Sequence, residues 1–268
     1  MGSKTAIEWT DSSWNPVTGC TKVSPGCDNC YAERLSKRFG WPWSVQTHED
    51  RLDIPRHWRK PRRVFVCSMG DLFHEDVPPR FSYKVLDTIW ANPQHIFQVL
   101  TKRPERFPAV FELWQDLCLS VPIHCRYVLP HNLWLGVTAE NQEEADRRIP
   151  LLLQMPAAVR FVSVEPMLEP VDLRRYMQAC GCGGLCDSGE PCPMAYNAIR
   201  LDWCIVGGET GPGARPMHID WARSLRNQCI AASVPFFFKS WGSPLLRKNT
   251  APAMLDGRVW REFPRVNE

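Results

Sequence analysis

Six short apolar runs, rich in Val, Ile, Phe and Leu, recur along the chain and constrain its fold more than any other feature. They span residues 63–68, 96–101, 133–138, 159–164, 203–208 and 234–239. Continuous apolar runs of this length are typical of strands buried on both faces, as in a parallel sheet. Helical patterns over 81–90, 143–152 and 220–230 lie between the runs, and Asp220 is the expected N-cap of the last. This alternation predicts an α/β fold.

A barrel fits the pattern better than a dinucleotide-binding sheet. No G-x-G-x-x-G follows the first of these strands, and chemically active side chains follow nearly every strand. Six or seven strands predict a partial (β/α)6-like parallel barrel over residues 1–243. A Cys-rich insert at 176–200 and an irregular tail at 244–268 complete the expected organisation. The tail is polar and proline-spaced, so we expect it to wrap the surface or fray.

Three cysteines near the N-terminus, Cys20, Cys27 and Cys30, form a compact group of candidate metal ligands. Zinc sites and ordinary iron–sulfur clusters take four protein ligands, so three thiolates suggest a cubane cluster with one iron open to a small molecule. Half of a zinc site, a redox dithiol or a chance pairing are the alternatives. A helix is expected to begin at Asp28 or Asn29.

A second cysteine group lies in the Gly- and Pro-rich insert. Its members are Cys180, Cys182, Cys186 and Cys192. Four thiolates with almost no apolar neighbours cannot form a packed core, and they suit structural zinc or a second iron–sulfur cluster. The spacing does not contain the two Cys-x-x-Cys pairs of a zinc ribbon, which weakens that interpretation. A flexible loop without metal is the alternative.

Charged residues recur where the predicted strands end. They are Asp71, Lys102, Arg103, Glu140, Glu165, Glu209 and Lys239. In a barrel these positions share one pole, where a mixed-charge bowl suits a zwitterionic ligand. Each residue taken alone fits an ordinary solvated loop equally well.

Composition sets broad limits on location and partners. The formal net charge of +3 permits a nucleic-acid partner without requiring one. Residues 51–63 hold six basic residues around Trp58, which predicts either a phosphate-tracking, base-stacking patch or a solvated face. No run of eighteen apolar residues exists, so no contact with a membrane is expected. Twelve cysteines without an apolar signal core indicate reduced thiols and a cytoplasmic location.

Several motifs together resemble a phage- and bacteria-associated family of uncharacterised proteins with a three-cysteine motif. They are Trp14-Asn15-Pro16-Val17-Thr18-Gly19-Cys20, Cys27-Asp28-Asn29-Cys30-Tyr31, Ser68-Met69-Gly70-Asp71, Thr101-Lys102-Arg103-Pro104 and Gly207-Gly208-Glu209. That family resembles an outlying branch of the radical SAM superfamily. The Thr-Lys and Cys-Tyr pairs are similar to those of spore photoproduct lyases, which repair DNA.

The resemblance implies a [4Fe–4S] cluster on Cys20, Cys27 and Cys30, with S-adenosyl-L-methionine (SAM) on the open iron. Reductive cleavage of SAM would yield a 5′-deoxyadenosyl radical that attacks a nucleic acid or nucleotide. The candidate catalytic residues are Lys102, Glu165 and Glu209. The candidate cofactor-binding residues are Ser68, Asp71, Thr101, Glu140, Gly207, Gly208 and Lys239.

The chain departs from the superfamily in two ways. The cysteine spacing is six and two residues rather than three and two, and Gly207-Gly208-Glu209 follows a late strand instead of the second. The expected partners are a nucleic acid, an electron donor such as flavodoxin or ferredoxin, and a protein with a three-cysteine motif. The alternative function is a zinc- or cluster-containing, nucleic-acid-binding phage accessory protein that does not turn over SAM.

Overall fold

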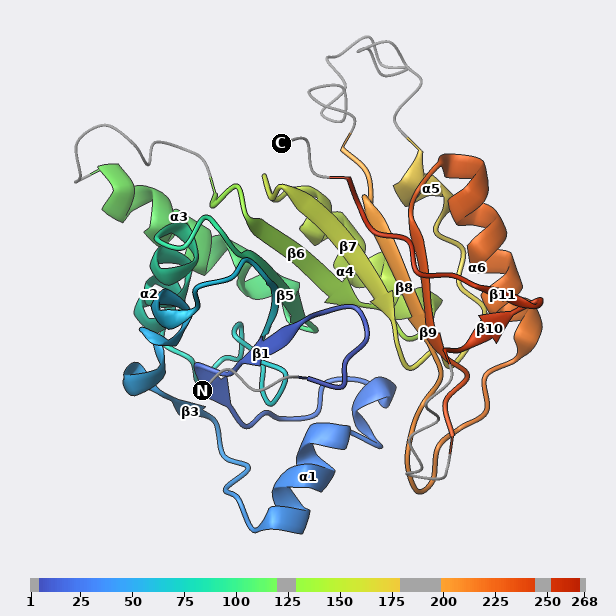
Figure 1. Ribbon diagram of the computed structural model, residues 1–268, viewed down its shortest axis with the longest axis horizontal. Helices are drawn as coiled ribbons and strands as arrows, with labels where there is room; N and C mark the ends of the chain where they lie inside the picture. The colour runs from blue at the N-terminus through green and yellow to red at the C-terminus, as the bar shows by residue number, and fades with distance from the viewer. Residues whose placement is uncertain (1–4, 120–128, 179–198, 244–251, 266–268) are drawn as a thin grey trace, which may run out of the picture.

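Seven parallel strands form one curled sheet, a half-barrel, in the computed structural model, which describes residues 5–119, 129–178, 199–243 and 252–265 (Figure 1). In spatial order they are β1 (Ser12–Trp14), β4 (Arg63–Val66), β5 (Ile96–Thr101), β6 (Leu133–Thr138), β7 (Val159–Val164), β8 (Trp203–Gly207) and β9 (Phe236–Ser240). The six predicted runs are therefore all strands, and β1, which precedes the first cysteines, is the seventh. The predicted partial parallel barrel is confirmed.

Helices follow most of the strands. They are α1 (Tyr31–Phe39), α2 (Pro79–Trp90), α3 (Phe107–Leu119), α4 (Gln142–Leu153), α5 (Arg174–Met177) and α6 (Ile219–Ala232), with short 3-10 turns at Pro25–Cys27, Glu49–Arg51, Ile54–His57 and Pro104–Arg106. The prediction that Asp220 caps α6 is wrong, because the ring of His218 accepts the hydrogen bond from the Asp220 amide at 3.2 Å. Asp220 instead lies inside the first turn, where a carboxylate favours the positive end of the helix.

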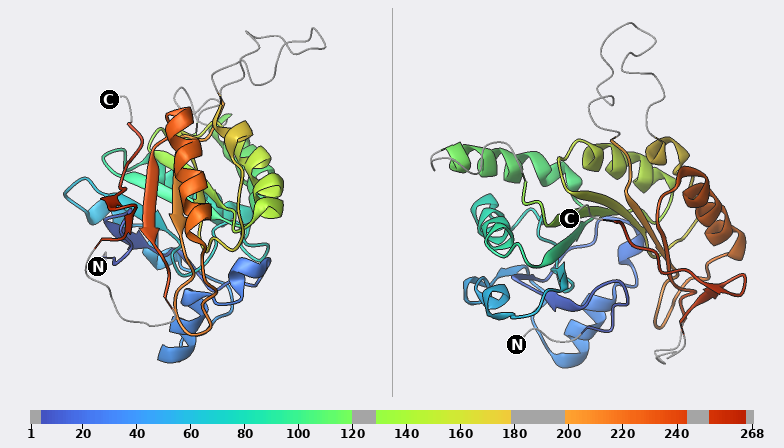
Figure 2. Two further views of the ribbon diagram at one scale, coloured as in Figure 1. Left: turned by 90° about the vertical axis from the view of Figure 1, so that its right-hand side faces the viewer. Right: turned by 45° about the horizontal axis from the view of Figure 1, so that its top comes forward.

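Side chains along each strand alternate between two buried layers. On β4, Val64 and Val66 face the layer shared with α2, α3, α4 and α6, while Phe65 faces the concave side. Figure 2 shows these helices along the outer face of the sheet. Aromatic rings fill the base of the concave side, where Trp9 lies 4.6 Å from Phe65 between ring centroids. A Cβ on Gly136 would lie 2.5 Å from the Phe161 ring, so this layer requires glycine there.

The described part of the C-terminal tail packs on the edge of the sheet. Two short antiparallel strands, β10 (Met254–Leu255) and β11 (Arg258–Val259), lead to Trp260, which is 7% exposed. Phe238 donates its amide to the Trp260 carbonyl oxygen at 2.9 Å. Residues 252–265 therefore do not fray; they cover the free edge of β9.

The second cysteine group and the absence of a membrane span are two further expectations. Cys180, Cys182, Cys186 and Cys192 lie outside the described residues, so the second metal site stays a prediction. Within the described part of the chain, no helix has both the length and the apolar character needed to cross a bilayer.

Candidate functional site

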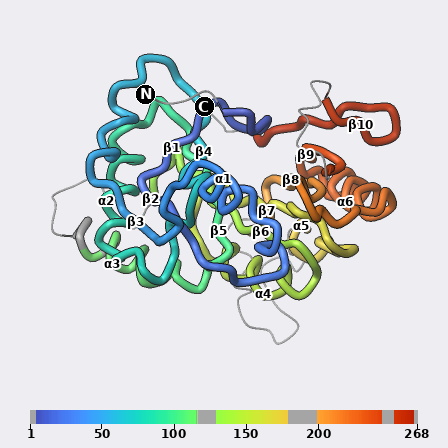
Figure 3. The backbone as a smooth tube through the Cα atoms, turned by 90° about the horizontal axis from the view of Figure 1, so that it is seen from below, coloured from blue at the N-terminus to red at the C-terminus, as the bar shows by residue number. Residues whose placement is uncertain are grey.

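The three-cysteine segment lies across the carboxyl ends of the parallel strands. It follows β2 (Val17–Thr18), which pairs with β3 (Gln46–Thr47), and it leads into α1. In Figure 3, which shows the molecule from below, α1 lies in front of the strands. The helix begins at Tyr31 with Cys30 at its N-cap, slightly later than expected. The cysteines therefore occupy the pole at which barrel chemistry takes place.

Hydrogen bonds from distant strand ends hold this segment in place. Gly26 donates its amide to the Glu140 carboxylate after β6 at 3.2 Å, and the Asn29 side chain donates to the Glu209 carboxylate after β8 at 2.9 Å. Arg215 reinforces the second contact, because its guanidinium binds Glu209 at 2.6 Å and the Pro25 carbonyl oxygen at 2.7 Å.

Arg103, which follows β5, connects Cys20 to the ends of the strands. Its side chain is 3% exposed, and Nη1 lies 3.4 Å from both the Cys20 sulfur and the Asp71 carboxylate. Nη2 donates to the Thr21 hydroxyl at 2.7 Å, and Nε donates to Glu75 at 2.8 Å. A buried guanidinium with four neighbours of this kind fixes the position of the first cysteine.

Two predicted cofactor-binding residues serve this support rather than the cavity. The Thr101 hydroxyl donates to Asp71 at 2.7 Å, and Asp71 accepts the Phe73 amide at 2.9 Å. Both Asp71 and Thr101 are buried, and neither lines the cavity described below.

The charges around the cysteine segment shift several pKa values. Burial raises the pKa of Cys20 to about 11, and Asp71 adds to the shift while Arg103 opposes it. Burial also disfavours the ionised form of Glu140, but Lys102 and Arg148 outweigh it and leave its pKa lowered. For Glu209, hydrogen bonds from Arg215 likewise overcome burial, so its pKa is lowered and the carboxylate is ionised at neutral pH.

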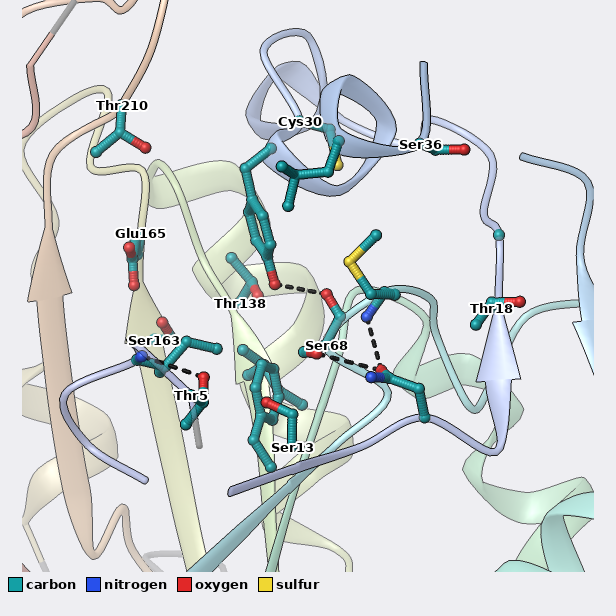
Figure 4. Close-up of a pocket in the computed structure, with 18 of the residues that line it drawn as sticks. Thr5, Ser13, Thr18, Cys30, Ser36, Ser68, Thr138, Ser163, Glu165 and Thr210 are labelled. Atoms are coloured by element: carbon teal, nitrogen blue, oxygen red, sulfur yellow. Dashed lines mark hydrogen bonds between the residues drawn. The ribbon is translucent and has the colours of Figure 1, made fainter. Parts of the chain in front are cut away.

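A cavity of about 1020 Å³ opens between the cysteine segment and the strand ends. Seven predicted site residues line it: Cys30, Ser68, Lys102, Glu165, Gly208, Glu209 and Lys239. Six others do not: Cys20, Cys27, Asp71, Thr101, Glu140 and Gly207. Figure 4 shows Cys30 on one side of the cavity, with Ser68, Ser163 and Glu165 on the strand side. Its volume lies at the upper end of ligand sites, which leaves room for two ligands.

Glu165 and Lys239 form an ion pair on the wall of this cavity. Both remain partly exposed, at 20% and 26% of their side-chain surface. The adjacent Gly208 is needed by the protein itself, because a Cβ there would clash with the carbonyl oxygen of Trp241. A zwitterion entering the cavity would meet a carboxylate and an ammonium group side by side.

Sequence reasoning missed several residues that shape the site. Asn15 accepts hydrogen bonds from the Met69 amide at 2.9 Å and the Ser68 hydroxyl at 3.2 Å, and Tyr31 donates its hydroxyl to the Ser68 carbonyl oxygen at 2.5 Å. Asn15 and Tyr31 lie inside the quoted motifs and could have been singled out there. Arg215 lies in no motif, so its role could only come from the structure.

The donor set fits an iron–sulfur cluster by its chemistry. Cys20, Cys27 and Cys30 are half-buried on one short segment, and the guanidinium of Arg103 donates to a sulfur that would carry negative charge as a ligand. Among the described residues, no three Cys, His, Asp or Glu side chains are already drawn together as a metal site. Binding would therefore bring the thiols closer than they lie here.

A family model matches residues 4–264, almost the whole chain. The chain belongs to the DUF5131 family, described as proteins of unknown function. No curated protein matches the DUF5131 sequence. Its fold is similar to spore photoproduct lyase complexed with dinucleoside spore photoproduct, at 8% identity and a TM-score of 0.50. The match covers 85% of this chain and 63% of that one, so this chain spans less than two thirds of that protein's length.

A cysteine-to-serine mutant of spore photoproduct lyase gives a similar result. The TM-score is 0.51 at 10% identity, over 90% of this chain and 78% of that one. At such identities the similarity establishes a shared fold for the DUF5131 protein.

Proposed function

We propose that this protein is a radical SAM enzyme that binds a [4Fe–4S] cluster through Cys20, Cys27 and Cys30 and acts on a nucleic acid or nucleotide. The observation that carries the proposal is the position of the cysteine segment, held over the carboxyl ends of a parallel half-barrel by Glu140 and Glu209. A cavity with a carboxylate and an ammonium group on its wall lies directly beside it. The similarity to spore photoproduct lyase supports the same reading.

When bound, the cluster and SAM supply reductive cleavage of a carbon–sulfur bond, with the electron delivered by a donor such as flavodoxin or ferredoxin. The residues of the chain would bind and orient SAM and the second ligand. Lys239 would donate to the carboxylate of SAM in place of Glu165, and Glu165 would accept a hydrogen bond from the amino group of SAM. Lys102, which also lines the cavity, would hold an anionic group of the second ligand.

Glu209 lines the cavity and also supports the cysteine segment. Its carboxylate already accepts hydrogen bonds from the side chains of Asn29 and Arg215, so it positions the cysteine segment. Glu140 does the same through Gly26. These two carboxylates fix where the cluster lies relative to the cavity.

Anaerobic reconstitution tests this function. The wild-type protein should bind iron and sulfide and form 5′-deoxyadenosine from SAM when reduced, and Cys30→Ala should abolish that product. Cys229→Ala is the matched control, because this cysteine is buried on α6 away from the cavity and should leave the product unchanged. Product formation by Cys30→Ala, or zinc without iron in the wild-type protein, would contradict the proposal, and zinc would favour the accessory-protein alternative.

A further inference from the structure

Two exposed aromatic rings follow each other at the end of α1. Phe39 and Trp41 are each 55% exposed, and their rings stack with centroids 5.0 Å apart and planes 25° from parallel. Gly40 between them adopts a φ of 67°, which ends the helix and lets the chain reverse. Large aromatic side chains are usually buried, so a stacked pair left open to solvent is a candidate ligand-binding surface.

The pair lies at the edge of the candidate cavity. Trp41 lines the cavity together with Pro42 and Trp43, whereas Phe39 lies behind Trp41 and outside the lining. Thr18, Gln46 and His48 also line the cavity and carry hydrogen-bonding groups, of which the Thr18 hydroxyl and the His48 ring are bonded to each other at 2.8 Å. A planar ring backed by a second ring, beside polar groups, matches a nucleobase in shape and chemistry.

Charge around the pair favours an anionic partner. The α1 helix that ends at the pair carries Arg34, Lys37 and Arg38 against Glu33, a net charge of +2. Arg38 is exposed and its guanidinium carbon lies 5.6 Å from the centroid of the Phe39 ring. Nucleic acid fits this combination of rings and positive charge, whereas an apolar protein surface would leave the charge unmatched.

Trp58, the tryptophan of the basic segment 51–63, is not available for base stacking. Trp58 is 8% exposed and contacts His95 edge-on at 5.5 Å, with Arg62 over its face at 4.8 Å. Its faces are taken, so it cannot stack on an added base.

We propose that Phe39 and Trp41 form a stacking platform for an unpaired base of a single-stranded or locally opened nucleic acid. Arg38 contacts the adjoining phosphate, and the platform guides the strand into the cavity. This inference rests on the proposed function, since it names the substrate class of the same site.

The test is binding of a labelled single-stranded oligonucleotide of about twelve nucleotides, followed by fluorescence anisotropy. Trp41→Ala should weaken binding about 5- to 150-fold, the loss expected for one stacked base. The dependence of affinity on salt should keep the wild-type slope in Trp41→Ala, because stacking releases no ions, and should fall by about 0.7 in Arg38→Gln.

Controls keep the outcome tied to the platform. Ile230→Ala removes an equally exposed apolar side chain from α6 and should bind as the wild type does. Trp41→Phe should recover part of the affinity, which excludes a folding defect at this position. Unchanged affinity in Trp41→Ala, or no oligonucleotide binding by the wild type, would overturn the proposal.

The same samples separate this inference from the proposed function. Formation of 5′-deoxyadenosine without oligonucleotide reports on the cluster site alone. If the protein binds the oligonucleotide through Trp41 but does not cleave SAM, the stacking proposal stands and the enzymatic function fails. If it cleaves SAM but does not bind the oligonucleotide, the enzymatic function stands and the stacking proposal fails.

Discussion

The carboxylate of Glu140 accepts a hydrogen bond from the amide of Gly26, 114 residues earlier in the chain, at 3.2 Å. The other oxygen of the same carboxylate accepts from Arg148 at 2.9 Å, and both side chains are fully buried. One buried ion pair therefore supports both the sheet and the cysteine segment.

Glu140→Gln should lower the free energy of unfolding by about 3–5 kcal/mol, because it leaves the Arg148 charge buried without one of its partners. Urea denaturation measures the change. Glu49→Gln, which breaks an exposed ion pair with Lys84, should cost no more than about 1 kcal/mol. Equal losses in the two variants would contradict a special role for the buried pair.

Acid should remove the contribution of Glu140. Its pKa is lowered in the folded state from an ordinary value of 4.5, so its ionised form stabilises the protein above that pH. The stabilisation declines as pH falls through the folded pKa. The stability difference between wild type and Glu140→Gln should therefore shrink as unfolding is measured at successively lower pH below 4.5. A constant difference would show that ionisation of this group does not matter.

Arg103→Lys should make the midpoint potential of the reconstituted cluster more negative. In the proposed cluster the N–H···S hydrogen bond to Cys20 would stabilise the extra negative charge of the reduced state, and lysine cannot reach Cys20, Thr21 and Glu75 together. A potentiometric titration followed by electron paramagnetic resonance measures the shift. Arg147→Lys, on the exposed side of α4, is the control. An unchanged potential at full iron content would remove Arg103 from this role.

Lys239→Gln should weaken SAM binding about 10- to 100-fold, the loss expected for one hydrogen bond to a charged group. Isothermal titration of the reconstituted protein gives the affinity. Lys84→Gln removes an exposed lysine from α2 and should have no effect. If Lys239→Gln binds SAM normally, the SAM carboxylate lies elsewhere in the cavity.

Trp260→Ala should lower the free energy of unfolding by about 3–5 kcal/mol, because the side chain is buried against Phe236 and donates to the Leu255 carbonyl oxygen at 3.2 Å. Thermal unfolding would register the loss. Val259→Ala, whose side chain is exposed on β11, should be nearly neutral. A neutral Trp260→Ala would mean that the tail adds little to the fold.

Six of the seven strands in the sheet could be predicted because each is a local run of apolar residues buried on both faces, whereas β1 has only the short sequence Ser12-Ser13-Trp14. The cysteine motif could be predicted because its three thiols lie on one short segment. The residues that hold this segment could not be predicted, since Gly26 and Asn29 bind Glu140 and Glu209, and no periodicity relates residues so far apart. The sequence left the role of Trp58 open, because the cover that His95 and Arg62 give its ring depends on contacts that no local pattern predicts.

The spacing of these partners sets an order of events during synthesis. The three cysteines leave the ribosome early, whereas Glu140, Glu209 and Arg215 emerge after half or more of the chain has been made. A nascent chain can form β1, β4 and β5 and still lack every contact that holds Gly26 and Asn29. If the protein binds the proposed cluster, metal delivered during translation would meet Cys27 and Cys30 before Glu140 and Glu209 hold their segment, so we expect productive loading after those residues have been made.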